Sequence, residues 1–394
     1  MQYAHRYIQY AVTALAGFNG SLPLQHYLKQ FFAADKKYGS KDRRFISHLC
    51  YCYFRTGHAL QQLPAEERIK VSLYLCSEQL EGWNDLFTQA WQQAHTPQLT
   101  QRIQFVVQQG IPFEAAAVFP WLQQCSSDID TTAFAHSHLL QPHVFLRVRP
   151  GMQKRVLQKL QQQQVVFTQP QPDCIALPPA SKADQFLQLN SEAVVQDLSS
   201  QRVGDVLLQA DNKRIRTVWD CCAASGGKSI LVKDLLSDIQ LTVSDVRASI
   251  IHNLKQRFAE AGIRSYQSFV ADLTDKEALK RGPVPGKGFD LIVCDAPCSG
   301  SGTWGRTPEQ LAFFTTAEID RYATLQRKIV TTAVNALAPG GFLLYITCSV
   351  FAAENEQQTA YIQNQLQLKP VAATLLKGYH EKADTMYAAL FTKA

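Results

Sequence analysis

A chain of 394 residues exceeds the length at which a single hydrophobic core stops growing, roughly 250 to 300 residues, and therefore predicts two or three domains. Hydrophobic residues make up 46% of the chain and charged residues 18%, which is the composition of a globular protein. The formal net charge of +6 permits an anionic partner such as nucleic acid without requiring one.

The ten cysteines are scattered along the chain. None are paired at the C-x-x-C spacing of zinc sites, and the chain is too long for a disulfide-stapled scaffold. The N-terminus has no unbroken apolar run like that of a secretory signal, and no later segment is long enough to span a membrane. We therefore expect a cytoplasmic protein with free thiols, no metal and no membrane partner.

The first part of the chain has helical periodicity. Apolar residues recur three and four positions apart, as in Ile46, Leu49, Cys50, Tyr53 and Phe54. This pattern predicts an all-helical domain over residues 1–137. Its segment 35–44, DKKYGSKDRR, carries five basic and two acidic residues, and a solvated surface turn and an RNA contact are both compatible with such a charge run.

A different pattern follows in residues 138–202. FLRVRP (145–150) alternates like a strand, KRVLQKLQQQQ is helical, and VVFTQP again resembles a strand. We expect a small α/β connector. Its basic residues could line a groove over RNA, although surface elements also carry such residues routinely, and we take Arg147 and Arg149 as candidate RNA contacts.

Residues 203–394 alternate between strands and helices, which is typical of a doubly wound parallel sheet with a Rossmann-like fold. The predicted strands are RTVWD (216–220), LTVSD (241–245), SFVAD (268–272), DLIVCD (290–295), FLLYITC (342–348) and MYAALFT (386–392), the last of them at the sheet edge. KSILVKDLL, ASIIHNLKQRFAEAG and LQRKIVTTAVNAL are the predicted helices. Every candidate functional residue falls at a strand's carboxyl end, where open α/β sheets bind ligands.

The stretch DCCAASGGKS, residues 220–229, ends like a phosphate-binding loop. A Walker-type loop needs glycine six residues before its lysine, and here that position is Cys222. Without this glycine the backbone lacks the freedom to wrap a triphosphate, so the sequence disfavours an NTPase.

Two aspartates end the second and third predicted strands. Asp245 follows Asp220 by 25 positions, close to the spacing at which an acid meets a ribose hydroxyl in dinucleotide folds. Asp272 is placed to face an adenine. An adenosine-containing cofactor is therefore indicated, while helix capping remains the alternative for both residues.

Two cysteines, Cys298 in DAPCSG and Cys348 in TCS, follow neighbouring predicted strands and could share one crevice. Cysteines are usually small buried hydrophobes, but an adjacent acid and a glycine-rich turn favour a chemical role for these two. Cys222 lines the candidate cofactor loop. The remaining cysteines keep the core interpretation: Cys50, Cys52, Cys76, Cys125, Cys174, Cys221 and Cys294.

Methylation of a pyrimidine at carbon 5 requires such a combination, because that carbon is a poor nucleophile until a thiolate adds to carbon 6. A carboxylate can then hydrogen bond to the ring edge, where charge shifts as the thiolate adds. The residues alone do not decide which of the two cysteines attacks.

The motifs DCCAASGGKS, VSD, VAD, DAPCSGSGTWGRTPE, LQRKIVTTAVNALAPGG and YITCSVFAAENE follow one another in this chain. In this order they resemble the Fmu/Sun (RsmB-like, NOL/NOP-type) family of RNA 5-methylcytosine methyltransferases, over a region from about residue 145 to the C-terminus. VQDLSSQ (195–201) also resembles that family. KYGSKDRRFISHLCYCYFRTGH resembles the NusB-like helical RNA-binding domain of RsmB-like members.

The resemblance implies S-adenosyl-L-methionine as the cofactor and RNA, ribosomal RNA in particular, as the substrate. The implied cofactor-binding residues are Cys222, Ala223, Ala224, Ser225, Gly226, Gly227, Lys228, Asp245, Asp272 and Asp295. Cys348 would be the nucleophile, Cys298 would assist elimination of the product, and Asp295 would hold the target base. We expect a monomer whose target base is single-stranded or flipped.

The chain departs from the family pattern at two places. Ser225 stands where proline is usual, which is expected to loosen the cofactor loop. After GTW the chain has Gly305 and Arg306 where two arginines are common, which leaves Arg306, together with Lys228, as a candidate RNA contact. These oddities motivate an alternative, a non-catalytic assembly factor that binds RNA and the cofactor. The intact Cys298 and Cys348 argue against it, and the TCS motif disfavours a DNA methyltransferase.

Overall fold

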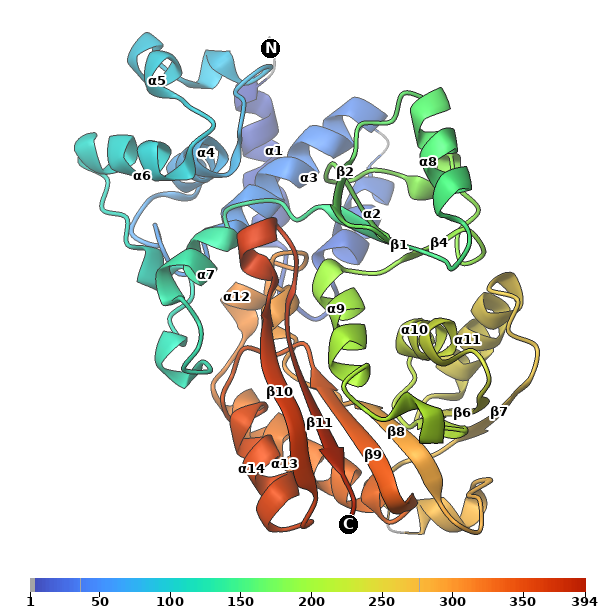
Figure 1. Ribbon diagram of the computed structural model, residues 1–394. Helices are drawn as coiled ribbons and strands as arrows, with labels where there is room; N and C mark the ends of the chain where they lie inside the picture. The colour runs from blue at the N-terminus through green and yellow to red at the C-terminus, as the bar shows by residue number, and fades with distance from the viewer. Residues whose placement is uncertain (1–3, 36, 276) are drawn as a thin grey trace. The chain divides into compact units, whose positions relative to one another are not determined.

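The computed structural model describes residues 4–35, 37–275 and 277–394, and its contacts divide the chain into two units (Figure 1). The helical unit comprises Met1–Gln123, Asp130–Gln141 and Thr303–Thr315, and the sheet unit comprises Gln124–Ile129, Pro142–Gly302 and Thr316–Ala394. The segment predicted as a separate connector therefore packs almost entirely as part of the sheet unit.

The helical unit confirms the helical prediction for the first part of the chain. Its helices are α1 (Ala4–Ala16), α2 (Leu24–Ala33), α3 (Ser40–Arg55), α4 (Ala65–Cys76), α5 (Gln89–Ala94), α6 (Leu99–Gln108), α7 (Thr131–Ser137) and α12 (Gln310–Phe313). Ile46, Leu49 and Cys50 are fully buried on one face of α3, as their spacing predicts.

Helix α3 begins inside the segment that the charge run suggested was a loop. Asp42, in its first turn, accepts a hydrogen bond from the Gly39 N–H at 2.8 Å and another from the Tyr7 hydroxyl at 2.8 Å. This side chain satisfies a backbone donor at the helix N-terminus, so residues 40–44 are helical. Lys36, in the same segment, lies outside the described residues.

A short segment late in the sequence packs with the helical unit because of its aromatic residues. Trp304 is buried, and its ring lies 5.5 Å from that of Phe119, 5.8 Å from that of Trp121 and 4.8 Å from that of Phe314. Burial of such large aromatic surfaces holds residues 303–315 in this unit.

The sheet unit is built on a seven-stranded sheet of order β10-β11-β9-β8-β5-β6-β7. Strands β9, β8, β5, β6 and β7 are parallel neighbours, while β10 and β11 are antiparallel. The bounds are β5 (Thr217–Asp220), β6 (Gln240–Asp245), β7 (Tyr266–Val270), β8 (Phe289–Asp295), β9 (Leu337–Thr347), β10 (Lys369–Lys377) and β11 (Thr385–Thr392). The doubly wound, Rossmann-like fold is confirmed.

One strand assignment was wrong. The last apolar run forms β11, which lies between β9 and β10 instead of at the edge. Strand β10 occupies the edge, and most of its side chains are exposed or half-buried, so it lacks the apolar pattern of a buried strand.

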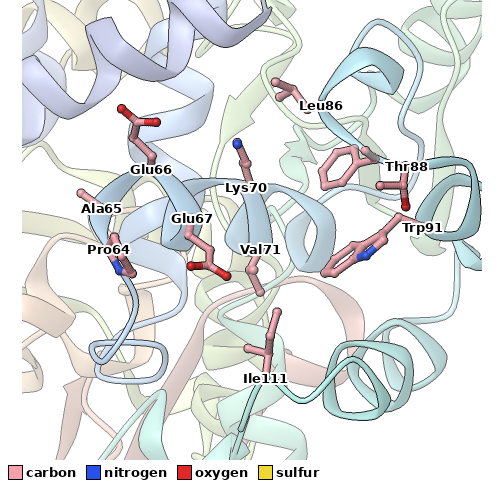
Figure 2. A pocket seen from close by; sticks show the side chains of 11 residues that line it. Pro64, Ala65, Glu66, Glu67, Lys70, Val71, Leu86, Thr88, Trp91 and Ile111 are labelled. Atoms are coloured by element: carbon pink, nitrogen blue, oxygen red, sulfur yellow. The ribbon is translucent and has the colours of Figure 1, made fainter.

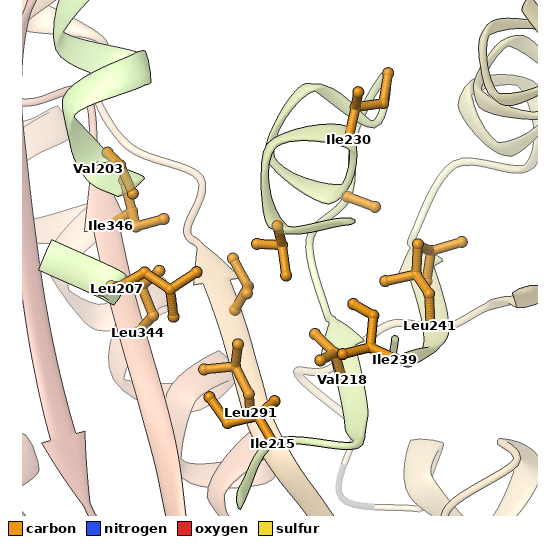
Figure 3. Close-up of a cluster of buried hydrophobic side chains, with 14 of the residues drawn as sticks. Val203, Leu207, Ile215, Val218, Ile230, Ile239, Leu241, Leu291, Leu344 and Ile346 are labelled. Carbon is orange, nitrogen blue, oxygen red and sulfur yellow. The ribbon is translucent and has the colours of Figure 1, made fainter. Parts of the chain in front are cut away.

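Helices cover both faces of this sheet (Figure 1). Helices α9 (Leu198–Leu207), α10 (Gly227–Leu236) and α11 (Ala248–Glu260) contribute to one buried hydrophobic cluster with alternate residues of the strands. Figure 3 shows part of it, including Val203, Ile230 and Leu291. Helix α13 (Ala317–Val334) packs against β8 and β9, and α14 (Glu356–Asn364) packs against α13.

The predicted connector forms a small antiparallel sheet of order β2-β3-β1-β4 with helix α8 (Gln153–Gln162). Its strands are β1 (Val144–Val148), β2 (Thr168–Gln171), β3 (Cys174–Leu177) and β4 (Ala193–Val195). In the described part of the chain, every helix is too short or too polar to cross a membrane.

Candidate active site

The carboxyl ends of β5, β6, β8 and β9 carry the candidate residues of the sheet unit. After β5 the chain turns sharply into α10 through Gly226, whose φ is +83°. A Cβ added at Gly226 would lie 2.6 Å from a ring carbon of Phe258, so both the left-handed backbone and the close packing require glycine. Gly227 has more room, since its nearest neighbour would be 3.7 Å away.

Asp245, at the end of β6, is buried and holds this loop in place. Its Oδ2 accepts a hydrogen bond from the Ala224 N–H at 3.1 Å, and its Oδ1 accepts from the backbone N–H and Nε of Arg247 at 3.0 and 3.1 Å. The loop after β5 is thus tied to the end of β6. The N-terminus of α10, with its partial positive charge, opens at this edge.

Asp272, two residues past β7, is exposed. Its Oδ1 accepts hydrogen bonds from the backbone N–H and hydroxyl of Thr274 at 2.9 and 2.7 Å, and these bonds lower the pKa of Asp272. The aspartate therefore stabilises a local turn, close to the capping alternative that the sequence left open.

Lys228 joins the cofactor loop to the end of β8. Its buried Nζ donates to Ser200 Oγ at 2.7 Å and to Asp295 Oδ2 at 3.2 Å. Ser200 lies on α9, within the VQDLSSQ motif that the sequence had singled out. The Asp295 side chain is 30% exposed, so the lysine fixes one of its oxygens while part of the carboxylate remains accessible.

Asp220, the last residue of β5, is almost fully buried and accepts a hydrogen bond from Ser229 Oγ at 2.5 Å. Burial raises the pKa of Asp220 to about 7, and the bond from Ser229 offsets only part of this effect. The sequence reasoning used this residue only to count spacing.

Cys298 and Cys348 are brought together, as the strand order predicts. Their Sγ atoms lie 3.2 Å apart, and both residues are half-buried. The hydrogen bond with Cys348, together with burial, holds the pKa of Cys298 well above its usual range. All ten cysteines are free thiols, which confirms that prediction.

A buried carboxylate that the sequence reasoning missed fixes the two cysteine loops. Glu354 Oε2 accepts from the Ser299 N–H and from Gln326 Nε2, both at 2.9 Å, while Oε1 accepts from Ser349 Oγ at 2.6 Å. Ser299 adjoins Cys298 and Ser349 adjoins Cys348. Burial raises the pKa of Glu354. Its only sequence signal is the acidic end of YITCSVFAAENE, which resembles a surface charge run.

The backbone also joins these loops. The Gly302 N–H donates to the Cys348 carbonyl at 2.9 Å. A Cβ added at Gly302 would lie 1.9 Å from the Thr385 carbonyl oxygen, so only glycine allows the loop after Cys298 to approach β11 this closely.

Ser225, the departure from the family's proline, has partners of its own. Arg257 Nη1 donates to Ser225 Oγ at 2.9 Å and to its carbonyl oxygen at 3.3 Å. Arg257 Nε also donates to Asn190 Oδ1 at 2.9 Å. The serine is therefore anchored to α11, and this anchor opposes the loosening that its sequence suggested.

Two of the candidate RNA contacts have structural partners instead. Arg147, on β1, is buried and pairs with Asp234 at 2.5 Å and with Gln196 Oε1 at 2.7 Å. Arg149 pairs with the same Asp234 at 2.8 Å and donates to the carbonyl oxygens of Asn190 and Ala261. Both guanidinium groups tie the small sheet to α10, so the RNA-contact prediction for Arg147 and Arg149 is corrected. Arg306 belongs to the helical unit.

A pocket of about 620 Å³ in the helical unit contains none of the candidate residues. Figure 2 shows Glu67, Lys70, Val71 and Trp91 among its lining side chains. No cysteine lines it, whereas the candidate thiols and acids follow the strand ends of the sheet unit.

The parallel sheet, the glycine turn into α10 and the acids at successive strand ends define a doubly wound, Rossmann-like fold. Solved structures share this fold. The crystal structure of PH0851 matches 99% of this chain and 98% of its own, with a TM-score of 0.68 and 19% identity. A methyltransferase homolog protein from Pyrococcus horikoshii matches 73% of this chain and 97% of its own, with a TM-score of 0.57 and 17% identity.

Sequence comparisons match the second half of the chain to RNA methyltransferases. Residues 206–389 match the model described as 16S rRNA methyltransferase RsmB/F. Over 199 residues the chain is 35% identical to ribosomal RNA small subunit methyltransferase B of Xanthomonas campestris, covering 50% of this chain and 44% of that protein. Over 195 residues it is 35% identical to the mouse tRNA (cytosine(72)-C(5))-methyltransferase NSUN6, covering 46% and 39%.

Residues 206–389 are therefore similar to the RsmB/F methyltransferase family, in agreement with the resemblance read from the motifs. The matched region spans about two fifths of the length of these curated relatives.

Proposed function

We propose that this protein is an S-adenosylmethionine-dependent RNA cytosine-5 methyltransferase with ribosomal RNA as its substrate. The observation that carries the proposal is the pair of cysteine sulfurs 3.2 Å apart, in loops that follow β8 and β9, with the partly exposed carboxylate of Asp295 at the end of β8. The family match of residues 206–389 and the named activities of its relatives support the same reaction.

The cofactor site is the edge formed by the loop after β5 and the acids after β6 and β7. Its residues fit S-adenosylmethionine for two reasons. Ala223, Ala224 and Gly227 are small, and the positive N-terminal end of α10 suits the carboxylate of the cofactor. Asp245 and Asp272 are the proposed partners of the ribose and adenine. When bound, the cofactor supplies an electrophilic methyl group.

In the proposed reaction Cys348 Sγ, as thiolate, forms a bond to carbon 6 of cytosine, which makes carbon 5 nucleophilic. Asp295, fixed by Lys228, holds the base through its N3 and amino edge. After methylation the carbon 5 proton passes to solvent, and the electron pair of that C–H bond restores the carbon 5–carbon 6 double bond. The carbon 6–sulfur bond breaks, and its electron pair returns to Cys348. Cys298, in contact with Cys348 Sγ, assists this elimination.

The helical unit offers a surface suited to RNA. Lys41, Arg43 and Arg44 are exposed in the first turns of α3. The Arg44 guanidinium lies 5.0 Å from the centre of the Phe45 ring. Basic groups interleaved with aromatic rings bind phosphates and bases, so we propose that α3 contacts RNA. Free thiols throughout the chain fit the proposed cytoplasmic location.

The test is transfer of radiolabelled methyl from S-adenosylmethionine to under-methylated small-subunit ribosomal RNA, as naked RNA and as particle, with transfer RNA as a parallel substrate. We expect label on carbon 5 of cytosine in ribosomal RNA and none with Cys348→Ala. Cofactor binding without transfer to any RNA would contradict the proposal and favour the assembly factor. Label in transfer RNA alone would overturn the choice of substrate.

A further inference from the structure

Three cysteine sulfurs that the proposed reaction does not use meet at the ends of β5 and β8. The Sγ atoms of Cys221, Cys222 and Cys294 all lie within 4.8 Å of one another. We propose that these three thiols form a binding site for a soft, thiophilic metal ion, Cu⁺.

Strand register explains why residues so far apart in sequence meet. Asp220 of β5 is paired with Val293 of β8, and the Cys221 N–H donates to the Val293 carbonyl at 2.9 Å. The next residues, Cys221 and Cys294, therefore lie side by side, pointing to the same face of the sheet. Both are buried, whereas Cys222 is half-buried and leaves the site accessible.

The spacing of the three sulfurs suits a metal ion. Three sulfurs bound at about 2.3 Å from one ion lie about 4 Å apart, and the three Sγ atoms here lie within 4.8 Å of one another. A bound ion takes cysteine as thiolate, so the thiol protons that it displaces would pass to solvent.

The ligand set selects the kind of ion. Thiolate sulfur prefers soft ions such as Cu⁺ and Zn²⁺, but structural zinc sites are almost always four-coordinate. Among the described residues, the group of possible ligands holds only these three sulfurs. No carboxylate oxygen of Asp220 or Asp295 belongs to this group of closely spaced atoms, so neither residue supplies a fourth ligand there. Three thiolate sulfurs can complete the coordination of Cu⁺ without a fourth ligand.

The site is separate from Cys298 and Cys348, although Cys222 also lies in the proposed cofactor loop. The proposal does not depend on methyltransferase activity, because it concerns the binding of the ion alone.

The test is anaerobic titration of the full chain with Cu⁺ against the chelator bathocuproine disulfonate, followed by copper X-ray absorption of the wild type. We expect one Cu⁺ retained per chain, with three sulfur neighbours. Cys294→Ser and Cys221→Ser should each weaken retention at least tenfold. The double variant Cys298→Ala/Cys348→Ala and the variant Cys50→Ser, changed in the helical unit, should retain the ion.

Circular dichroism of each variant separates loss of the site from loss of folding. If Cys294→Ser does not fold, the wild-type absorption spectrum and the Cys298→Ala/Cys348→Ala variant still decide the matter. Copper with two sulfur neighbours, or copper lost from the Cys298→Ala/Cys348→Ala variant, would place the ion at the other cysteine pair and overturn the proposal. Zn²⁺ retained with Cu⁺ excluded would overturn the choice of ion.

Discussion

The loop after β5 and the two cysteine loops after β8 and β9 lie at the same edge of one sheet, but they are held in different ways. The first takes its shape from its backbone, with Gly226 in the left-handed region and the Ala224 N–H bonded to Asp245. The cysteine loops converge on one buried side chain, Glu354. A loop defined by its backbone should tolerate changed side chains but not an added Cβ, whereas loops that share one buried acceptor should be strongly destabilised when that acceptor is lost.

The largest effect is expected from Glu354→Ala. The substitution removes the acceptor of three hydrogen bonds in the protein interior, which we expect to lower the free energy of unfolding by about 3–5 kcal/mol. Glu354→Gln keeps one carbonyl oxygen and should lose less. Chemical denaturation measures both, with Glu318→Ala as the control, because the Glu318–Arg321 ion pair is solvent-accessible and worth less than about 1 kcal/mol. Equal losses for Glu354→Ala and Glu318→Ala would show that Glu354 does not hold the loops.

The next largest effect is expected from Gly226→Ala. An alanine there combines a left-handed backbone with a Cβ that meets Phe258, at a cost of about 2–4 kcal/mol. Gly227→Ala is the matched control, since its Cβ has room and alanine favours a helix. Thermal denaturation should show a loss of stability, and calorimetric titration with S-adenosylmethionine a loss of affinity, for Gly226→Ala only. A stable, cofactor-binding Gly226→Ala protein would refute the backbone account of this loop.

Asp220 makes stability depend on pH. Its pKa is about 7 in the folded protein against an ordinary value of 3.8, so between these values the folded state binds more protons than the unfolded state. The contribution of Asp220 to the free energy of unfolding is therefore largest below pH 4. It falls as the pH rises, by about 2 kcal/mol between pH 4 and 6. Asp220→Asn should remove this part of the slope. Denaturation curves of both proteins at several pH values test it, and parallel slopes would contradict it.

The smallest effect is expected from Ser225→Ala. The substitution removes the hydrogen bond from Arg257 to the serine hydroxyl and leaves the one to the backbone carbonyl. We therefore expect the free energy of unfolding to fall by about 0.5–1 kcal/mol. We expect a modest rise in the dissociation constant for S-adenosylmethionine, measured by calorimetry. A loss as large as that of Gly226→Ala would mean that side chains, rather than the backbone, define this loop.

Much of the sheet and its site could be predicted from the sequence, because buried parallel strands are apolar and their carboxyl ends collect the functional residues. Cys298 and Cys348 could be paired on this basis alone. Strand β10 could not be found, since its side chains are largely exposed. The role of Glu354 was hidden because an acidic residue near the C-terminal end of a motif resembles surface charge.

Other features depend on contacts that sequence spacing does not reveal. Arg147 and Arg149 were predicted to contact RNA, but both pair with Asp234, which lies far from them in the sequence. The packing of Trp304 with the helical unit depends on aromatic partners nearly two hundred residues earlier. Cys221 and Cys294 meet only through strand register.

The measurement that tests the central claim most directly is trapping of a covalent RNA adduct. Cys298→Ala, incubated with S-adenosylmethionine and under-methylated ribosomal RNA, should accumulate a protein–RNA species that survives denaturing electrophoresis, because carbon 6 stays bonded to Cys348 when elimination is slow. Cys348→Ala and the double variant Cys298→Ala/Cys348→Ala should form none. An adduct with Cys348→Ala but not with Cys298→Ala would make Cys298 the nucleophile and contradict the account.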